Sequence, residues 1–455
     1  MIAGVEISTS SLEVVLTPEE DDTEEAGRAR AGRRRFGVWA PDGHGFDGVH
    51  PDLVALSVLL VAQPWTGSRL VLRGVDGVSE RLAAAVRSAY GIELTADPRL
   101  EPRSAPADGR PGLAFSGGVD STAAMVLLPR ETPLLFLNRV GPDRSPSTSQ
   151  YQSAAALRAL DELSREGRET YAVDTDLEHT RRPTGFPTHW ANAVPALLLA
   201  DRLRLHSISW GMVLEAAFMV GSAGGFQDWS GRRAMRRLSA LFAAVDLPVS
   251  PVVAGLSEIA TARVVHGSPY SSITQSCIQG SVEACGRCKK CFRKGLLDAA
   301  LSSKRWTSAD LDVFYREEPV RRVLSEVPLH HENVYGFLLS GYAGSDRVLS
   351  LMRRQLRVEG ADHTLFDRYY PDALRLVHRS HRAHVRSALL QHLGPMSADE
   401  VARVQAWRPV GVADAQAHEE LLSTLQGYAT STARTSLRER LALPSRLRRR
   451  FGRPG

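Results

Sequence analysis

The stretch GLAFSGGVDSTAAMVLLP, Gly112–Pro129, joins an apolar run to a helical pattern through two adjacent glycines, Gly117 and Gly118. The run GLAF is typical of a buried strand, and STAAMVLL has the spacing of a helix. A glycine-rich turn at a helix N-terminus presents several backbone N–H groups at the positive end of the helix dipole. The glycines permit the turn and let a ligand approach the backbone. We therefore expect an anion site here, and for this kind of fold a phosphate site.

The polar residues of the same turn suit a phosphate ligand. Ser116, Ser121 and Thr122 add hydroxyl donors, and Asp120 is suited to hold a magnesium ion that bridges phosphate oxygens. The alternative is a tight strand–helix turn that Asp120 or Ser121 only caps. The stretch is not a Walker A loop, because no Gly-Lys-Ser/Thr follows, and it lacks the G-x-G-x-x-G spacing of dinucleotide-binding folds.

Short apolar runs alternate with helical segments from Gly112 to about Pro251. Runs this apolar, separated by helices, predict an α/β fold with a five-stranded parallel sheet that helices cover on both faces. Ligands of such sheets bind beyond the carboxyl ends of the strands. The five predicted strands are GLAFS (112–116), PLLFLNRV (133–140), ETYAVDTD (169–176), HSISWG (206–211) and LPVSPVV (247–253).

Composition shifts divide the chain further. The first region predicts a small α+β domain, within which the charged stretch Glu19–Arg35 has no apolar face and is expected to be a loop. The stretch Glu101–Gly112 is rich in Pro, Gly and Arg and is typical of a linker. After the cysteines the pattern is mostly helical and ends in a basic tail. The predicted division is 1–105 (α+β), 106–275 (nucleotide-binding α/β), 276–294 (zinc knuckle) and 295–455 (helical).

All four cysteines of the chain lie close together in the stretch CIQGSVEACGRCKKC. Two C-x2-C steps that share one cysteine cannot all be disulfides, and thiolates at this spacing can surround one tetrahedral Zn²⁺. An iron–sulfur cluster is the competing interpretation; zinc is favoured because the four ligands are local and close the site. The predicted zinc ligands are Cys277, Cys285, Cys288 and Cys291.

The stretch SGGVDS, Ser116–Ser121, resembles the pyrophosphate-binding loop of the N-type ATP pyrophosphatases, which carry a HUP-like five-stranded parallel sheet. The order of the motifs, with the loop first and SC…CGRCKKC later, is most similar to the 7-cyano-7-deazaguanine synthases. The resemblance covers about Gly112–Lys294. It implies an enzyme that binds ATP and Mg²⁺, with Zn²⁺ in a structural role. The residues implied to contact ATP are Ser116, Gly117, Gly118, Val119, Asp120, Ser121, Thr122, Asn138, Arg139 and Gly211, with Ser116, Asp120 and Ser121 as the catalytic group.

The substrate side departs from that family. Asn192 and Gly211 fall at matching places, but Ala191 stands where the family has an arginine. The family's substrate stretch is replaced by FQDW, of which only Asp228 is kept, and a lysine usual after the last strand is missing near Ser257-Glu258. The resemblance thus implies the ATP chemistry more strongly than the deazaguanine substrate. Asn192, Glu215 and Asp228 are the predicted substrate contacts.

The implied reaction is an AMP-forming C–N ligation. A carboxylate or amide, carried by a small molecule or a macromolecule, attacks the α-phosphate of ATP and pyrophosphate leaves. Ammonia or an amine then displaces AMP to give an amide, which a second activation would convert to a nitrile. A tRNA thiolase is a rival, although every cysteine lies in the cluster and none is left to carry a persulfide. A non-catalytic nucleotide- or nucleic-acid-binding protein is a second rival.

Composition places the protein among ordinary globular proteins. The chain has 455 residues with a formal net charge of +5, and 43% of the residues are hydrophobic. No signal peptide is recognisable, and the longest apolar run, Leu53–Ala62, is too short to span a bilayer. We therefore expect a cytoplasmic protein without a membrane partner, and leave a homodimer open. The basic tail, Arg446–Gly455, could touch a nucleic acid, but a solvated terminus is the favoured interpretation.

Overall fold

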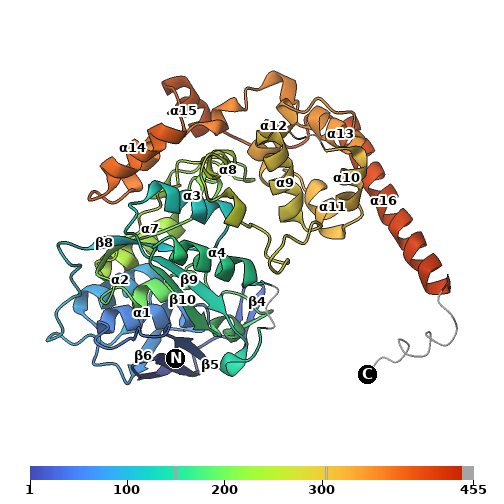
Figure 1. Cartoon of the computed structure of the whole chain (residues 1–455). Helices are drawn as coiled ribbons and strands as arrows, with labels where there is room; N and C mark the ends of the chain where they lie inside the picture. Colours follow the sequence, from blue (N-terminus) through green and yellow to red (C-terminus); the bar gives the residue numbers. More distant parts are fainter. Residues whose placement is uncertain (148–150, 303, 305, 443–455) are drawn as a thin grey trace. The chain divides into compact units, whose positions relative to one another are not determined.

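The structure is a computed structural model that describes residues 1–147, 151–302, 304 and 306–442 (Figure 1); for 431–442 only the backbone is described. The chain folds into two compact units. The first consists of Met1–Val220, Phe226–Cys285 and Phe366–Ala406. The second consists of Gly221–Gly225, Gly286–Leu365 and the chain from Trp407 onward. In sequence, 221–225 and 286–365 of the second unit are inserted between segments of the first, and its last part follows Ala406.

Four of the five predicted strands form and lie side by side as a parallel group. The fifth run, 247–253, makes only an isolated parallel bridge, from Val249 to Ile208. Pro248 and Pro251 interrupt this run, and a proline cannot donate to a ladder of hydrogen bonds. The order of the parallel group is β12 (Leu205–Trp210), β8 (Arg110–Ala114), β9 (Leu134–Arg139) and β10 (Thr170–Thr175).

The sheet continues beyond β10, which corrects the expected five-stranded parallel sheet. β5 (Arg35–Trp39) pairs antiparallel with β10, Trp39 opposite Asp174. Nine of the described strands form one sheet, parallel over most of its ladders. The N-terminal strands thus cover the backbone edge that β10 would otherwise expose. The remaining strands follow β5 in the order β2 (Ser11–Thr17), β1 (Ile2–Ile7), β6 (Arg69–Arg73) and β7 (Glu93–Leu94).

Helices pack on both faces of the parallel strands. Leu134 and Phe136 of β9 share one apolar cluster with residues of α3, α4, α8 and α14. Leu135 and Leu137 are also buried, but they alternate to the other face, where α5 contacts β8 and β9. The helices of this unit are α1 (Pro51–Ala62), α2 (Glu80–Tyr90), α3 (Val119–Leu127), α4 (Ala154–Arg165), α5 (Val194–Leu198), α6 (Leu214–Ala217), α7 (Arg233–Ala244), α8 (Glu258–His266), α14 (Arg382–His392) and α15 (Ala398–Gln405).

The charged stretch Glu19–Arg35, expected to be a loop, contains two short strands. β3 (Glu25–Ala26) and β4 (Ala29–Ala31) form a three-stranded sheet with β11 (Arg181–Arg182). Ion pairs hold the stretch in place, and Arg33 reaches Asp176 at 3.1 Å. The stretch is ordered although it has no apolar face, because opposite charges within it and around it form ion pairs.

The second unit is helical, as the sequence after the cysteines predicts. α13 packs against α16, and the buried Tyr315 hydroxyl donates to Asp346 at 2.8 Å. The helices of this unit are α9 (Lys289–Leu301), α10 (Ser308–Tyr315), α11 (Glu318–Leu324), α12 (Glu332–Ser340), α13 (Arg347–Gln355) and α16 (Ala415–Ala442). The predicted basic tail, Arg446–Gly455, lies outside the described residues.

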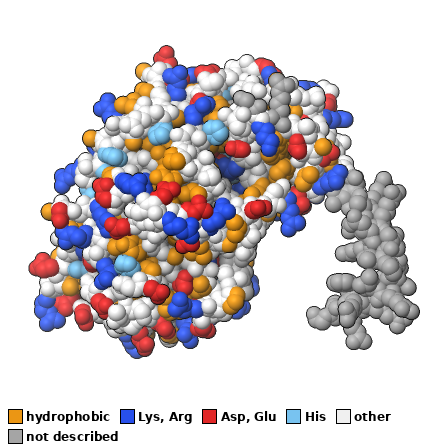
Figure 2. Space-filling view, in the orientation of Figure 1, with side chains coloured by type: hydrophobic (Ala, Val, Ile, Leu, Met, Phe, Trp, Pro, Cys, Tyr) orange, Lys and Arg blue, Asp and Glu red, His pale blue; other side chains and the backbone are white. Residues whose placement is uncertain are grey.

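Surface composition is mixed. Figure 2 shows basic and acidic side chains interspersed over one face of the molecule. Among the described residues, no helix has both the length and the apolar character needed to cross a membrane.

Candidate functional site

The glycine corner, Ser116–Thr122, lies at the carboxyl end of β8. Its flanking strands are β9 and β12, with Ala114 paired to Leu135 on one side and to Trp210 on the other. Gly117 has φ +71°, and a Cβ there would lie 3.1 Å from the Ala156 Cα, so the fold requires glycine at this position. Gly118 is the N-cap of α3 and has no side chain to cap the helix. The predicted strand–turn–helix is therefore present.

Hydroxyl groups hold the corner in shape. The Ser116 N–H donates to the Ser121 Oγ at 3.2 Å, and the Ser121 hydroxyl donates to the Gly118 carbonyl at 3.0 Å. Ser121 and Thr122 are buried, whereas Ser116 is exposed. Ser121 and Thr122 thus support the corner from within, and Ser116 is the hydroxyl presented to solvent.

Three contacts that the sequence analysis did not predict complete the corner. The Gln275 N–H donates to the Gly117 carbonyl at 2.9 Å, and the Val119 N–H donates to the Ser276 Oγ at 3.2 Å. The Thr261 hydroxyl of α8 donates to the Asp120 carboxylate at 2.9 Å. Ser276 directly precedes the first cysteine, and this neighbourhood was the only signal in the sequence for such a contact.

The corner presents backbone N–H groups that have no acceptor among the described residues. No residue that the structure describes accepts a hydrogen bond from the N–H of Gly117, Gly118 or Ser121. Gly211, at the end of β12, lies against the first turn of α3: a Cβ there would be 2.8 Å from the Ser121 N. Gly211 is thus brought to the corner, and its lack of a side chain keeps the first turn of α3 uncovered on that side.

Asn138 and Arg139, at the end of β9, are engaged with neighbouring side chains. The Asn138 amide donates to Asp174 at 2.7 Å, and Arg139 pairs with Glu178 at 3.0 Å. The Arg139 guanidinium also stacks over the Tyr151 ring, 4.0 Å from its centroid. Burial lowers the pKa of Arg139, opposed by the Glu178 charge. Both side chains are thus held by partners at the end of β9, the strand next to β8.

Asn192, Glu215 and Asp228, the predicted substrate residues, each have their own set of contacts. The Asn192 Oδ1 is buried and accepts no hydrogen bond from any described residue. Glu215, in α6, accepts from the Glu258 N–H at 3.2 Å. Asp228 binds the Ser230 N–H at 2.9 Å and forms an ion pair with Arg375. Burial would raise the pKa of Asp228, but these hydrogen bonds outweigh it and lower the pKa. None of the contacts of Asp228 within the described chain involves the glycine corner.

The four cysteines converge within the short cysteine segment, Cys277–Cys291, and their sulfur atoms lie within 4.8 Å of one another. The Cys288 and Cys291 sulfurs are 3.6 Å apart, close to the separation of about 3.8 Å that two sulfurs would have at about 2.3 Å from one tetrahedral Zn²⁺. Cys288 is the N-cap of α9 and accepts the Cys291 N–H. The group could hold a metal ion such as zinc.

Backbone donors also favour thiolates at this group. The Cys277 sulfur accepts the N–H of Gly280 at 3.2 Å and of Cys285 at 3.3 Å. Burial alone would raise the pKa of Cys277, but these N–H groups, together with that of Gln279, give a net lowering of the pKa. N–H donors that stabilise a sulfur anion are what a metal-bound thiolate needs.

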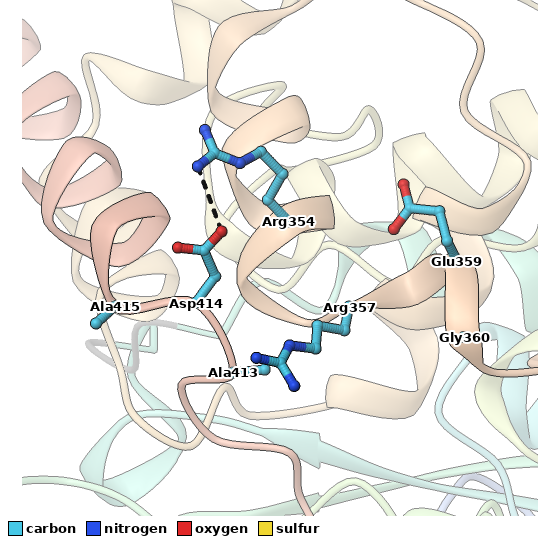
Figure 3. Close-up of a pocket in the computed structure, with 7 residues that line it drawn as sticks. All are labelled: Arg354, Arg357, Glu359, Gly360, Ala413, Asp414 and Ala415. Atoms are coloured by element: carbon cyan, nitrogen blue, oxygen red, sulfur yellow. Dashed lines mark hydrogen bonds and ion pairs between the residues drawn. The ribbon is translucent and has the colours of Figure 1, made fainter.

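The second unit has an open polar depression of about 630 Å³ at the end of α13 (Figure 3). Arg354 pairs there with Asp414 at 3.3 Å, and Arg357 and Glu359 also line it. Its charges are balanced, and none of the residues predicted from the sequence lines it.

Comparison with known proteins gives one finding. The model of a family of unknown function (DUF6395) matches residues 237–408, from within α7, through the cysteine segment, to just beyond α15. The match does not include the glycine corner. No curated protein and no solved structure matches the chain.

Proposed function

We propose that the protein is an N-type ATP pyrophosphatase that adenylates a substrate carboxylate and releases pyrophosphate. The observation that carries the proposal is the glycine corner. It lies at the carboxyl end of a central parallel strand, where open α/β sheets bind ligands. The order of the run 247–253, β12, β8, β9 and β10 supports the HUP-like arrangement of that class.

Gly118 supports a ligand at the corner. Its backbone is extended, with φ −85° and ψ 163°, a conformation open to any residue. A Cβ there would meet nothing closer than the Ser116 Oγ at 3.6 Å. The fold itself therefore gives no reason for glycine at this position. A phosphate group that approaches the backbone closely would give one.

The residues of the corner divide into two roles. The N–H groups of Gly117 and Gly118 and the Ser116 hydroxyl would hold the β and γ phosphates. Asp120, oriented by Thr261, would hold Mg²⁺, which neutralises the charge that develops on the pyrophosphate. Ser121 and Thr122 keep the turn in shape. Asn138 and Arg139, at the end of the neighbouring strand β9, would contact adenine and ribose.

The proposed reaction has two steps. A carboxylate oxygen attacks the α-phosphorus, the bond to the bridging oxygen breaks, and pyrophosphate leaves through the corner. Ammonia or an amine then attacks the acyl carbon, loses a proton and displaces AMP, which gives an amide. In a second round, the oxygen of a primary amide would attack the α-phosphorus of another ATP and release pyrophosphate; loss of a proton and departure of the oxygen with AMP would then give a nitrile, as in 7-cyano-7-deazaguanine synthases. Because Ala191 stands where the family has an arginine, and FQDW replaces its substrate stretch, we place a different carboxylate substrate alongside the deazaguanine one.

The zinc proposed for the cysteine segment has no part in the chemistry. Residues 274–276 contact the corner through Gln275 and Ser276, and Cys277 follows directly. A metal at the cysteines would fix this segment, and thereby hold the contacts to Gly117 and Val119. Its contribution is to keep the corner in place.

The test is the nucleotide product formed by the full chain with Mg²⁺ and a panel of carboxylates, 7-carboxy-7-deazaguanine among them. We expect AMP and pyrophosphate, and about 100-fold slower turnover in Asp120→Asn, from loss of the magnesium ligand. Asp161→Asn changes an exposed carboxylate of α4 and serves as the matched control. Formation of ADP, or equal rates in the two variants, would contradict the proposal.

A further inference from the structure

Three histidines from distant parts of the chain converge at the edge of the sheet opposite the glycine corner. His206 stands near the start of β12, whereas the corner follows the carboxyl end of the parallel strand β8. His378 and His381 come from the segment before α14, which returns to the first unit. One ring nitrogen of each histidine lies within 4.8 Å of the other two. We call this group the histidine cluster.

One nitrogen of each ring lies near a common point. The Ser380 Oγ occupies that point, at 2.9 Å from His206 Nε2, 2.8 Å from His378 Nδ1 and 3.3 Å from His381 Nδ1. Three imidazole nitrogens around one small centre are an arrangement that first-row transition metals use in proteins. The serine hydroxyl stands where such an ion would lie.

The outer nitrogens of the two buried rings are fixed by other hydroxyls. His206 Nδ1 lies 3.0 Å from the Ser207 Oγ, and His381 Nε2 lies 3.0 Å from the Ser250 Oγ. The Ser250 hydroxyl also accepts the backbone N–H of His378 at 2.9 Å. Metal-binding histidines are typically held this way, because a hydrogen bond on the outer nitrogen sets the tautomer and the ring orientation.

The environment keeps the rings in the neutral form that binds a metal. Burial lowers the pKa of His206 to about 4 and that of His381 to about 3, and nearby imidazoles add to both effects. The pKa of His378 is also lowered, first by burial and then by the charge of Arg379. Neutral imidazole, not imidazolium, is the ligand form.

We propose that His206, His378 and His381 form a second metal site, for a divalent first-row transition-metal ion such as Zn²⁺. At a Zn–N distance of about 2.0–2.1 Å, each nitrogen would move inward by about 1 Å and the Ser380 side chain would rotate away. Ser380 is exposed, so a fourth position would be open to water. The ion would join β12 to the returning segment 366–406. This proposal does not depend on the ATP chemistry.

The experiment counts zinc in the full chain. Purified protein is stripped with a chelator, reloaded with ZnCl₂, freed of excess metal and analysed by mass spectrometry of the bound metal. His378→Gln removes the half-buried ligand, and His384→Gln, an exposed histidine on α14, is the matched control. We expect His378→Gln to retain one zinc per chain fewer than wild type, and His384→Gln to equal wild type. Equal zinc in all three proteins would overturn the proposal.

Two further measurements separate this site from the cysteines and from a purely structural role. With Co²⁺ as probe, His378→Gln should keep the thiolate charge-transfer band and Cys288→Ser should lose it. Ser380→Ala should retain the zinc count of wild type and gain thermal stability on adding zinc. If the cluster were held only by the Ser380 hydrogen bonds, Ser380→Ala would lose stability that zinc could not restore, which would overturn the proposal.

Discussion

Substituting alanine at Gly117 and at Gly118 should distinguish a glycine that the fold requires for stability from a glycine that a bound phosphate requires for activity. At Gly117 the left-handed backbone, φ +71°, and the Ala156 Cα at 3.1 Å both oppose a methyl group. At Gly118 neither obstacle exists, because the backbone is extended and the nearest atom is 3.6 Å away. The two substitutions add the same atom one residue apart.

The expected stability changes follow from these geometries. Gly117→Ala should cost about 2 kcal/mol, from the left-handed conformation and the contact with Ala156. That corresponds to a fall in Tm of about 4 °C for a unit of this size. Gly118→Ala reduces the entropy of the unfolded chain but gives a poorer N-cap, and the two effects of about 0.5 kcal/mol each roughly cancel.

Activity should fall in both variants. A methyl group at Gly118 would occupy the space in which a phosphate oxygen approaches the backbone, and we expect AMP formation to slow by about 100-fold. Thermal unfolding and AMP formation are measured on the same preparations, with Gly231→Ala as control, since a Cβ there meets no atom within 4 Å. A Gly118→Ala protein with normal stability and normal turnover would refute the reasoning that the corner receives the phosphates.

Three further predictions concern other parts of the chain. Arg103 is buried, pairs with Asp201 at 2.7 Å and donates to three backbone carbonyls. Arg103→Met should therefore lower the free energy of unfolding, measured by urea titration, by about 3 kcal/mol. A loss no larger than that of the exposed Arg99→Met would contradict this. In the His378→Gln background, which lacks the proposed histidine site, a chelator should lower the Tm by removing metal from the cysteine segment. The double variant His378→Gln/Cys291→Ser, which cannot close the cysteine site, should keep its Tm, and the same shift in both proteins would argue against a structural metal. Burial raises the pKa of Glu332, although the hydrogen bond from the Val410 N–H opposes this, so the folded state binds the proton more tightly than the unfolded state. Stability therefore falls as the pH rises above the pKa that Glu332 has in the unfolded chain. Glu332→Gln should have a higher Tm than wild type at pH 8 and nearly the same Tm at pH 5, and a gain independent of pH would count against this cause.

The sequence predicted what local patterns determine. The glycine corner is one such case, because an apolar run, two glycines and a helical spacing stand next to one another in Gly112–Pro129. The cysteine segment is another, since all four ligands lie in one short stretch. In both, the groups that must meet are already close in the chain, and the structure brings them together.

Local sequence patterns could not predict which distant segments pair with one another. The antiparallel pairing of Trp39 with Asp174 extends the sheet, yet nothing in either strand specifies the other. The charged stretch Glu19–Arg35 was expected to be a loop because it has no apolar face; Asp176, which pairs with Arg33, lies far along the chain and could not be foreseen as its partner. Thr261 and Ser276 were missed at the corner for the same reason. The histidine cluster needs His206 and His381 to meet, and lone histidines carry no such signal.

The order of the segments along the chain has a consequence for biosynthesis. The apolar side of α3 and α8 is completed by Val385 and Leu389 of α14, which the ribosome adds only after the whole of Gly286–Leu365. At about 5–20 residues per second, the nascent sheet waits on the order of ten seconds for its last helices. During that interval its apolar surface is open to other nascent chains, so we expect the yield of soluble protein to depend on growth temperature and on holding chaperones more than the stability of the finished molecule would suggest.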